Sequence, residues 1–238
     1  MSSTETGYPK NAANFKDLII RLNTLGDDYQ PPKAMFELKA LEQLSKNAED
    51  AMRAVSQVLP VYSKAVDDQE LIFKPLNNLI TKSFNYLKAA IANPAELQTA
   101  KTIADGLRGQ SKRKVVATDA PASTASTKRL SYDSKVENLK RYIEVLSASK
   151  IYTPKESDIS IASLQALLLA MENSITAVAI AKTPLDDARK KRHTIFYAEQ
   201  IGLVETVFGV KNYIKASLHQ DHPERKHILA LSFKKMKQ

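Results

Sequence analysis

The sequence predicts an all-α protein, a helical bundle built from two tandem repeats of about 95 residues. Hydrophobic residues make up 43% of the 238-residue chain, which is enough to bury a core. Only 6 glycines, no tryptophan and no recurring Asn-Gly or Asp-Gly turn argue against a β-rich fold. The apolar residues recur at alternating spacings of three and four, which is the pattern of a helix with one buried face.

Four helices are expected in the first half of the chain, after a disordered lead-in. The first helix is expected to bury a stripe that begins at Phe15. Pro60 lies within the second and is expected to kink or end it. An Asn93-Pro94 cap opens the fourth. The lead-in is residues 1–13, and the four helices are expected at about 14–26, 32–67, 75–92 and 94–107.

A long apolar helix over about 153–181 is expected at the centre of the second half. Thr153-Pro154-Lys155-Glu156 has the composition of a capping box, in which the Glu side chain reaches back to the Thr amide. Apolar residues then cover nearly the whole circumference from Ile161 to Val178. Because such a helix is typical of a central position, we expect the others to wrap it. Thr183-Pro184 is expected to start the next helix.

The second half of the chain repeats the order of the first. Tyr29-x-Pro31 recurs 123 residues later as Tyr152-x-Pro154. The stripe of the second helix recurs at the same offset, so that Leu38 to Val55 matches Ile161 to Val178. Earlier anchors recur at an offset of 121 residues and later ones at 127 and 129. Offsets that only grow along the chain are typical of a duplication, and they place the repeats at 14–109 and 135–231.

A linker and a tail complete the predicted organisation. Residues 110–134 are predicted to form a flexible linker, basic at its start and then rich in Ala, Ser and Thr. Such a segment has too few apolar groups to offset the entropy of ordering. Residues 232–238 are predicted to be a basic tail. Two repeats on such a tether can dock as one bundle or stay separate, and the apolar helix over 153–181 favours docking.

The composition also argues against several classes of protein. The lack of cysteine excludes disulfides, thiolate metal sites and cysteine nucleophiles. Residues 1–15 contain no apolar stretch of the kind found in a secretory signal. Gln165, Glu172 and Asn173 interrupt the most apolar segment, which disfavours a membrane span. We therefore expect a soluble protein of the cytoplasm.

The formal net charge of +9 arises from three local basic clusters. Lys and Arg residues that lie together can neutralise phosphates of a nucleic acid, so these clusters are candidate polyanion-binding sites. The alternative for the second cluster is a solvated helix, in which Asp186 pairs with Lys190 and Asp187 with Lys191. The candidate residues are Arg108, Lys112, Arg113, Lys114, Arg189, Lys190, Lys191, Arg192, Lys234 and Lys235.

No catalytic residue, cofactor or metal site is predicted. The chain has no glycine-rich phosphate loop, no Gly-x-Ser-x-Gly motif and no His-Glu-x-x-His motif. His219, His222 and His227 are interpreted as surface residues at a helix boundary, because Pro223 breaks their helical register. The paired acids Asp67-Asp68 are interpreted as boundary residues too. An enzyme with a site in the bundle core is considered only if buried carboxylates face one another.

The segments Arg189 to Tyr197, Gly202 to Val204 and Val210 to Lys215 resemble the C-terminal part of a family of uncharacterised bacterial proteins. Ala100 to Gln110 is similar to the end of that family's first repeat. The resemblance implies a bacterial, duplicated, helical protein and carries over no catalytic or binding residue. The chain departs from the family at Ala216-Ser-Leu-His219, where members often have Ser-Val-Phe-Gly.

The expected function is that of a non-enzymatic structural or protein-interaction module, with another protein as its partner. Helical surfaces and a flexible tether suit this role. The alternative is a protein that associates with nucleic acid without sequence preference, through the clustered basic residues.

Overall fold

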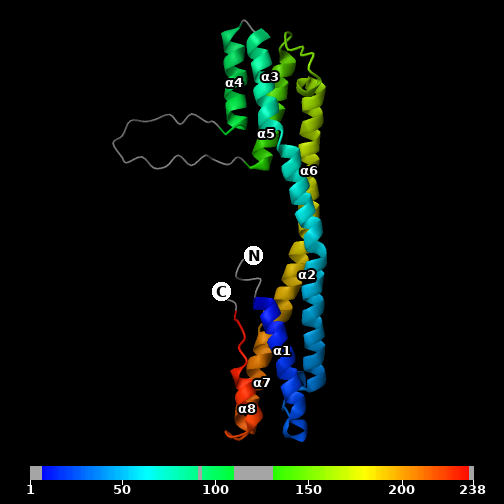
Figure 1. The fold of residues 1–238 in the computed structure, drawn as a ribbon, viewed down its shortest axis with the longest axis vertical. Helices are drawn as coiled ribbons and strands as arrows, with labels where there is room; N and C mark the ends of the chain where they lie inside the picture. Colours follow the sequence, from blue (N-terminus) through cyan, green and yellow to red (C-terminus); the bar gives the residue numbers. More distant parts are fainter. Residues whose placement is uncertain (1–6, 91–92, 110–130, 236–238) are drawn as a thin grey trace, which may run out of the picture. The chain divides into compact units, whose positions relative to one another are not determined.

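The computed structural model describes residues 7–90, 93–109 and 131–235. These residues form helices and no strand, which confirms the predicted all-α class (Figure 1). The α-helices are α1 Gly7–Thr24, α2 Leu38–Phe73, α3 Leu76–Ala90, α4 Pro94–Leu107, α5 Tyr132–Ala148, α6 Ile161–Tyr197, α7 Leu203–Ser217 and α8 Pro223–Ala230. Short 3₁₀-helices are η1 Gly26–Asp28, η2 Ala34–Phe36 and η3 Ser157–Ile159.

The chain divides into two compact units, and each unit combines parts of both halves of the sequence. The first unit contains Met1–Tyr62 and Ala181–Gln238, and the second contains Ser63–Ile180. The boundaries fall inside α2 and α6, so each of these helices contributes to both units. Each unit has a hydrophobic core of its own.

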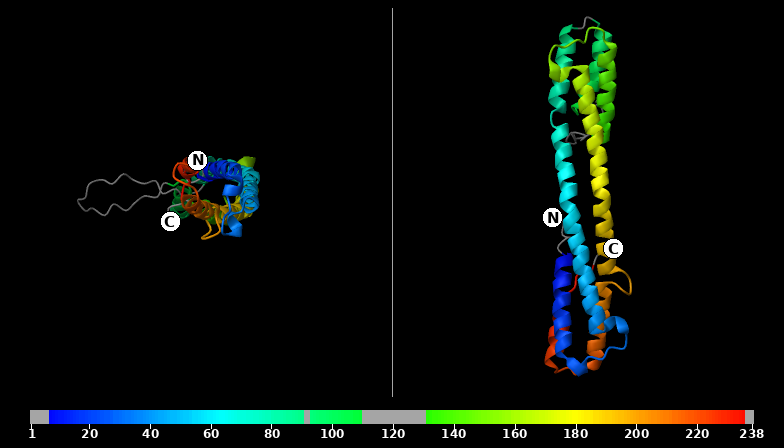
Figure 2. Two further views of the ribbon diagram at one scale, coloured as in Figure 1. Left: turned by 90° about the horizontal axis from the view of Figure 1, so that it is seen from below. Right: turned by 90° about the vertical axis from the view of Figure 1, so that its right-hand side faces the viewer.

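In the first unit, α1 packs against α7 and α8 (Figures 1 and 2). Phe15, Leu18 and Leu22 are fully buried, and their spacing of three and four places them on one face of α1. The short helix η2 lies against α7. There the ring of Phe36 occupies the space beside Gly209, where a Cβ atom would lie 2.9 Å from the Phe36 Cε1 atom. Glycine is therefore required for this close approach.

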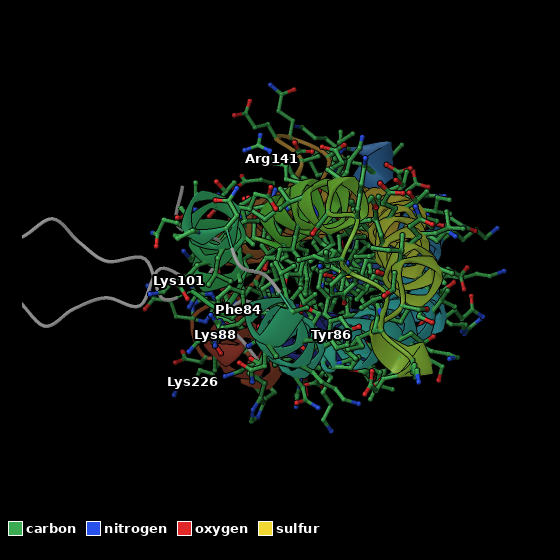
Figure 3. The ribbon with its side chains drawn as sticks, turned by 90° about the horizontal axis from the view of Figure 1, so that it is seen from above. Phe84, Tyr86, Lys88, Lys101, Arg141 and Lys226 are labelled. Atoms are coloured by element: carbon green, nitrogen blue, oxygen red, sulfur yellow. The ribbon has the colours of Figure 1, made fainter. Side chains whose placement is uncertain are left out.

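In the second unit, α4 packs against both α3 and α5. The Tyr142 ring is fully buried, and its hydroxyl lies 3.1 Å from the Ser83 Oγ atom, so the buried polar atoms satisfy each other. Figure 3 shows the charged side chains of Lys101 on α4 and Arg141 on α5 directed outward. This is the arrangement of amphipathic helices around an apolar core.

One set of contacts occurs in both units. The Tyr29 hydroxyl donates to the Phe36 carbonyl at 2.6 Å, and the Tyr152 hydroxyl donates to the Ile159 carbonyl at 2.7 Å. Both rings make edge contacts with a second tyrosine, namely Tyr213 for Tyr29 and Tyr86 for Tyr152. Burial raises the pKa of both buried phenols. The segments that lead into α2 and α6 are therefore held by the same two contacts, a hydrogen bond from a tyrosine hydroxyl and an edge contact between two tyrosines.

The described part of the predicted lead-in is helical. Residues 7–13 belong to α1, and residues 1–6 lie outside the described residues. The Tyr8 ring packs edge-on against Phe196 and Tyr197, with centroids 5.1 and 5.5 Å apart, and Ala12 is buried one turn later. The predicted start at Asn14 is wrong because these contacts extend the helix by two turns.

The predicted starts of both long helices are also wrong. α2 begins at Leu38 rather than near Pro32 and continues past Pro60 to Phe73. The predicted capping box at 153–156 is not helical, and α6 begins at Ile161. Ser160 is the residue that caps α6, since its Oγ atom accepts from the Ser163 amide at 3.2 Å. Thr183-Pro184 starts no helix, because α6 runs through Pro184.

The helices α3 and α4 lie close to their predicted bounds, and the Asn93 cap is confirmed. The Asn93 side chain accepts from the Ala95 amide at 3.0 Å, with Pro94 in the first turn. The predicted linker over 110–134 falls mostly outside the described residues, but α5 already begins at Tyr132. The described part of the predicted tail, 232–235, is held against α1, and 236–238 lie outside the described residues.

Candidate interaction surface

The first half of α6 exposes much of its apolar surface. Only 22% of its most apolar 18-residue stretch is buried. Leu164 and Met171 are fully buried on one side of the helix, whereas 58% of Leu169 and 68% of Ile180 are exposed. The expectation that other helices wrap this one is therefore wrong. The helix packs through one side alone, and the opposite side remains apolar without being covered in the second unit.

Five exposed residues form a regular row along this side, here called the α6 seam: Ala166, Leu169, Asn173, Thr176 and Ile180. Their spacings are three, four, three and four residues, which is the spacing of the contact positions of a coiled coil. None of the five is charged. The Thr176 hydroxyl donates to the Glu172 carbonyl of the same helix at 3.2 Å, and its lone pairs remain able to accept a further bond.

The corresponding positions of α2, 123 residues earlier, differ completely in chemistry. At this offset the buried positions also coincide, since Leu41 and Ala48 are fully buried like Leu164 and Met171. The exposed row of α2 carries three charges, and two of them form an ion pair of 3.4 Å between Asp50 and Arg53. The five α2 positions are Gln43, Lys46, Asp50, Arg53 and Gln57, and all are exposed.

The basic cluster at 189–192 lies on α6, within the first unit, and its side chains have different environments. Lys190 and Lys191 are exposed, whereas only 7% of Arg192 is. The Arg192 guanidinium lies over the Tyr8 ring, 4.0 Å from its centroid, which is a cation–π contact. Asp186 pairs with Lys182 at 3.2 Å, on the turn before it rather than the turn after. Arg192 is thus part of the fold.

A buried polar cluster surrounds the start of α1 and was missed from the sequence. The fully buried Asn11 side chain donates to the Lys234 carbonyl at 3.0 Å and accepts from the Lys234 amide at 2.9 Å. It also lies 3.3 Å from the Tyr197 hydroxyl, whose pKa is raised by burial. Asn11 fixes the C-terminal segment to α1 in this way. The spacing of Tyr8, Ala12 and Phe15 was the available signal for a longer α1.

The other basic candidates are also divided between the two units. In the second unit, Arg108 pairs with Asp105 at 2.6 Å and lies over the Phe84 ring, 5.9 Å from its centroid. Lys112, Arg113 and Lys114 lie outside the described residues. In the first unit, the Lys235 ammonium lies over the Phe208 ring, 4.3 Å from its centroid. Arg108, Arg192 and Lys235 are therefore engaged by the protein's own aromatic and acidic groups, whereas Lys190 and Lys191 stay exposed.

The lysine Lys211 was not singled out from the sequence, although it closes the end of α8. Its ammonium donates to the carbonyls of Leu229, at 3.1 Å, and Leu231. Burial lowers the pKa of Lys211. A cation at the last carbonyls of a helix stabilises its C-terminus, so this lysine has a structural role.

The described residues contain no group of three or more His, Asp and Glu side chains that could hold a metal ion. His219 and Asp221 lie 3.4 Å apart and are both exposed. Across 7–90, 93–109 and 131–235 no carboxylate is buried, so the facing acids that a bundle-core enzyme site would need do not occur there. The buried polar residues in these ranges are Asn11, Gln69, Ser83, Ser174, Arg192 and Thr206.

A surface depression of about 630 Å³ lies in the second unit, between the end of α2 and the start of α5. Its lining mixes the acids Asp67 and Glu70 with the bases Lys74 and Lys135. The Lys135 ammonium already lies over the Tyr132 ring, 5.6 Å from its centroid. The depression therefore offers no uniform charge or apolar floor, and the α6 seam is the more distinctive surface.

By length and composition, α6 is also apolar enough to cross a membrane. The same is true of many core helices, so the surroundings of the helix have to be considered. Gln165, Glu172 and Asn173 lie exposed within the apolar stretch, and each would be costly to place in hydrocarbon.

In comparisons with models of protein families, with curated proteins and with solved structures, no match to this chain was found.

Proposed function

We propose that this chain is a non-enzymatic protein-interaction module of the bacterial cytoplasm, built by tandem duplication, and that it binds its partner through the α6 seam. The observation that carries the proposal is the uncharged, exposed seam on a helix whose counterpart α2 is charged at three of the five matching positions. Charged residues are depleted at the centres of protein interfaces. A helix face that contacts only solvent usually carries charged residues, as the exposed row of α2 does.

The duplication is supported by contacts that recur at matching positions. The Tyr29 and Tyr152 hydroxyls, 123 residues apart, each donate to a carbonyl seven residues further on. The ring pairs Tyr8–Phe196 and Tyr132–Phe73 likewise recur, one in each unit, with centroids 5.1 and 4.6 Å apart. In this proposal α1 to α4 correspond to α5 to α8. The two copies began alike and now differ at the exposed row, which suggests that one copy gained a binding partner there.

The alternative of a nucleic-acid-associated protein has weaker support. Arg108 and Arg192 are engaged by Asp105 and by the Tyr8 ring, respectively. Lys190 and Lys191 remain exposed and could contact phosphates. Binding of labelled oligonucleotides that weakens steeply with salt and with Lys190→Ala/Lys191→Ala would favour this alternative.

The proposal is tested by placing a photo-crosslinking residue at matched positions of the two helices. One variant carries p-benzoylphenylalanine in place of Leu169, and its control carries it in place of Lys46, the exposed α2 counterpart. In cells that produce the chain, illumination is expected to give protein adducts from position 169 and few from position 46. Equal yields at both positions, or no adduct from 169, would contradict the proposal.

A further inference from the structure

We infer that the partner of the α6 seam is the α6 seam of a second copy of this chain, paired antiparallel about a twofold axis. This inference rests on the proposed function, since it names the partner of the same surface.

The order of residue types in the seam is the same in both directions. From Leu169 to Ile180 the spacings are four, three and four, and the types are apolar, polar, polar and apolar. In an antiparallel pair centred between Asn173 and Thr176, each Leu169 therefore lies opposite the other copy's Ile180. A twofold interface requires a surface that is complementary to itself, and this row meets that condition.

The two polar residues also match in this arrangement. Each Asn173 lies opposite Thr176 of the other copy. The Thr176 hydroxyl already donates within its own helix, so it can accept a bond from the amide of Asn173. Two such bonds would satisfy the polar centre of the seam, and a buried polar centre of this kind fixes the register of a helix pair.

The charges further along α6 favour the antiparallel orientation over the parallel one. Arg189, Lys190, Lys191 and Arg192 follow the seam on the same helix. In a parallel pair every residue lies beside its own copy, so the exposed Lys190 and Lys191 of one copy would come close to those of the other. An antiparallel pair keeps the clusters at opposite ends, which avoids this repulsion.

The extent of the seam predicts a weak pair. From Ala166 to Ile180 the helix rises roughly 21 Å, and with a helix diameter of about 10 Å the flat footprint is roughly 210 Å² per copy. A stable interface buries about 800 Å² of accessible surface per partner. The pair is therefore expected to form at micromolar concentrations or above and to dissociate on dilution.

The association is tested with the purified full-length chain by sedimentation velocity between about 1 and 500 µM, the range expected for a small interface. We expect dimers at the upper end. Leu169→Glu should weaken the association by more than about 100-fold, because each dimer loses two apolar contacts and brings two carboxylates to the seam. The matched change Lys46→Glu on α2 should leave it unaltered. Circular dichroism confirms that both variants stay helical.

The orientation is tested with engineered disulfides, which are the only ones the cysteine-free chain can form. A mixture of Leu169→Cys and Ile180→Cys chains is expected to give the mixed 169–180 dimer on oxidation. Leu169→Cys alone should give little disulfide-linked dimer. In the antiparallel pair the two copies of position 169 are offset by 11 residues, or roughly 16 Å along the helix, which is beyond disulfide reach. Dimers from Leu169→Cys alone, without the mixed species, would show a parallel pair and overturn the inference.

The outcomes separate this inference from the proposed function. A chain that stays monomeric throughout, while position 169 still crosslinks to other proteins in cells, overturns self-pairing and leaves an interaction module with a different partner. A monomer without adducts at position 169 overturns both. If the chain sediments with phosphatidylglycerol–phosphatidylcholine vesicles and the Leu169→Glu variant does not, the seam binds a membrane surface. That result would also overturn both self-pairing and the proposed function.

Discussion

The replacement Gly209→Ala tests the packing of η2 against α7 directly. Inside a helix, alanine is more favourable than glycine by roughly 0.8–1 kcal/mol, so the change should be stabilising in the absence of contacts. At Gly209, however, the new methyl group would lie 2.9 Å from the Phe36 Cε1 atom and within 3.3 Å of two further atoms of that ring. Overpacking of this kind costs about 1–3 kcal/mol.

The Phe36 ring has little freedom to move away. Only 7% of the residue is exposed, and its carbonyl accepts the Tyr29 hydroxyl at 2.6 Å. We therefore expect Gly209→Ala to lower the free energy of unfolding by up to about 2 kcal/mol, after the gain in helix propensity is subtracted. For a chain of this size each kcal/mol corresponds to roughly 2–4 °C in Tm.

The matched control is Gly106→Ala, at a helical glycine whose added Cβ atom meets nothing within 4 Å. This variant is expected to be as stable as the wild type or more stable by up to about 1 kcal/mol. Urea unfolding followed by circular dichroism measures both. Because the glycines lie in different units, separate transitions would assign each effect to its own unit.

The double variant Phe36→Leu/Gly209→Ala identifies the cause of the loss. If the ring is what the new methyl group meets, the two changes together should cost about 1–2 kcal/mol less than the sum of the single changes. Additive costs, or a Gly209→Ala variant as stable as Gly106→Ala, would refute the packing of Phe36 on α7.

Two further predictions concern buried polar contacts. Burial raises the pKa of Tyr142 to about 12, so the contribution of Tyr142 to stability is full below pH 10, the ordinary value, and falls by roughly 2–3 kcal/mol as the pH rises to 12. Tyr142→Phe should remove the part of the alkaline loss of stability that is due to Tyr142. At pH 7 it should lower the free energy of unfolding by about 1 kcal/mol, because the bond to Ser83 is lost. Urea unfolding between pH 7 and 12 measures both effects, and an unchanged dependence of stability on alkaline pH would contradict this prediction. Arg192→Ala should lower the free energy of unfolding by about 1–3 kcal/mol, because the contact with Tyr8 and the packing of the buried Arg192 side chain are lost. The control Lys191→Ala, at an exposed position, should change Tm by less than about 2 °C. Similar losses in both variants would argue against a structural role of Arg192.

Local signals were sufficient to predict α3 and α4. The Asn93 cap and Pro94 specify a helix start through bonds to the next few residues, so no distant contact is needed. The start of α6 could not be predicted in this way. Thr153 to Glu156 match a capping box, but the segment is held out of the helix by the bond from the Tyr152 hydroxyl to the Ile159 carbonyl. A tertiary contact here overrides a local preference.

The candidate site was only partly visible in the sequence. The spacing that identified α6 as strongly apolar could not show which side is covered, because exposed Leu169 and buried Leu164 have the same character. A comparison of α6 with α2 at an offset of 123 residues was the available signal, since Lys46 stands where α6 has Leu169. For the basic clusters, the aromatic partner of Arg192 comes from α1, 184 residues away, and no local pattern indicates it.

The sharing of α2 and α6 between two units has a consequence for synthesis on the ribosome. The second unit, Ser63–Ile180, is contiguous and can close as soon as its last residue has emerged. Residues up to Tyr62 must wait for α7 and α8, which end at Ala230. At 5–20 residues per second that delay is roughly 8–34 s, during which the apolar face of α1 is uncovered. We therefore expect the nascent chain to bind a chaperone that holds amphipathic helices until translation ends.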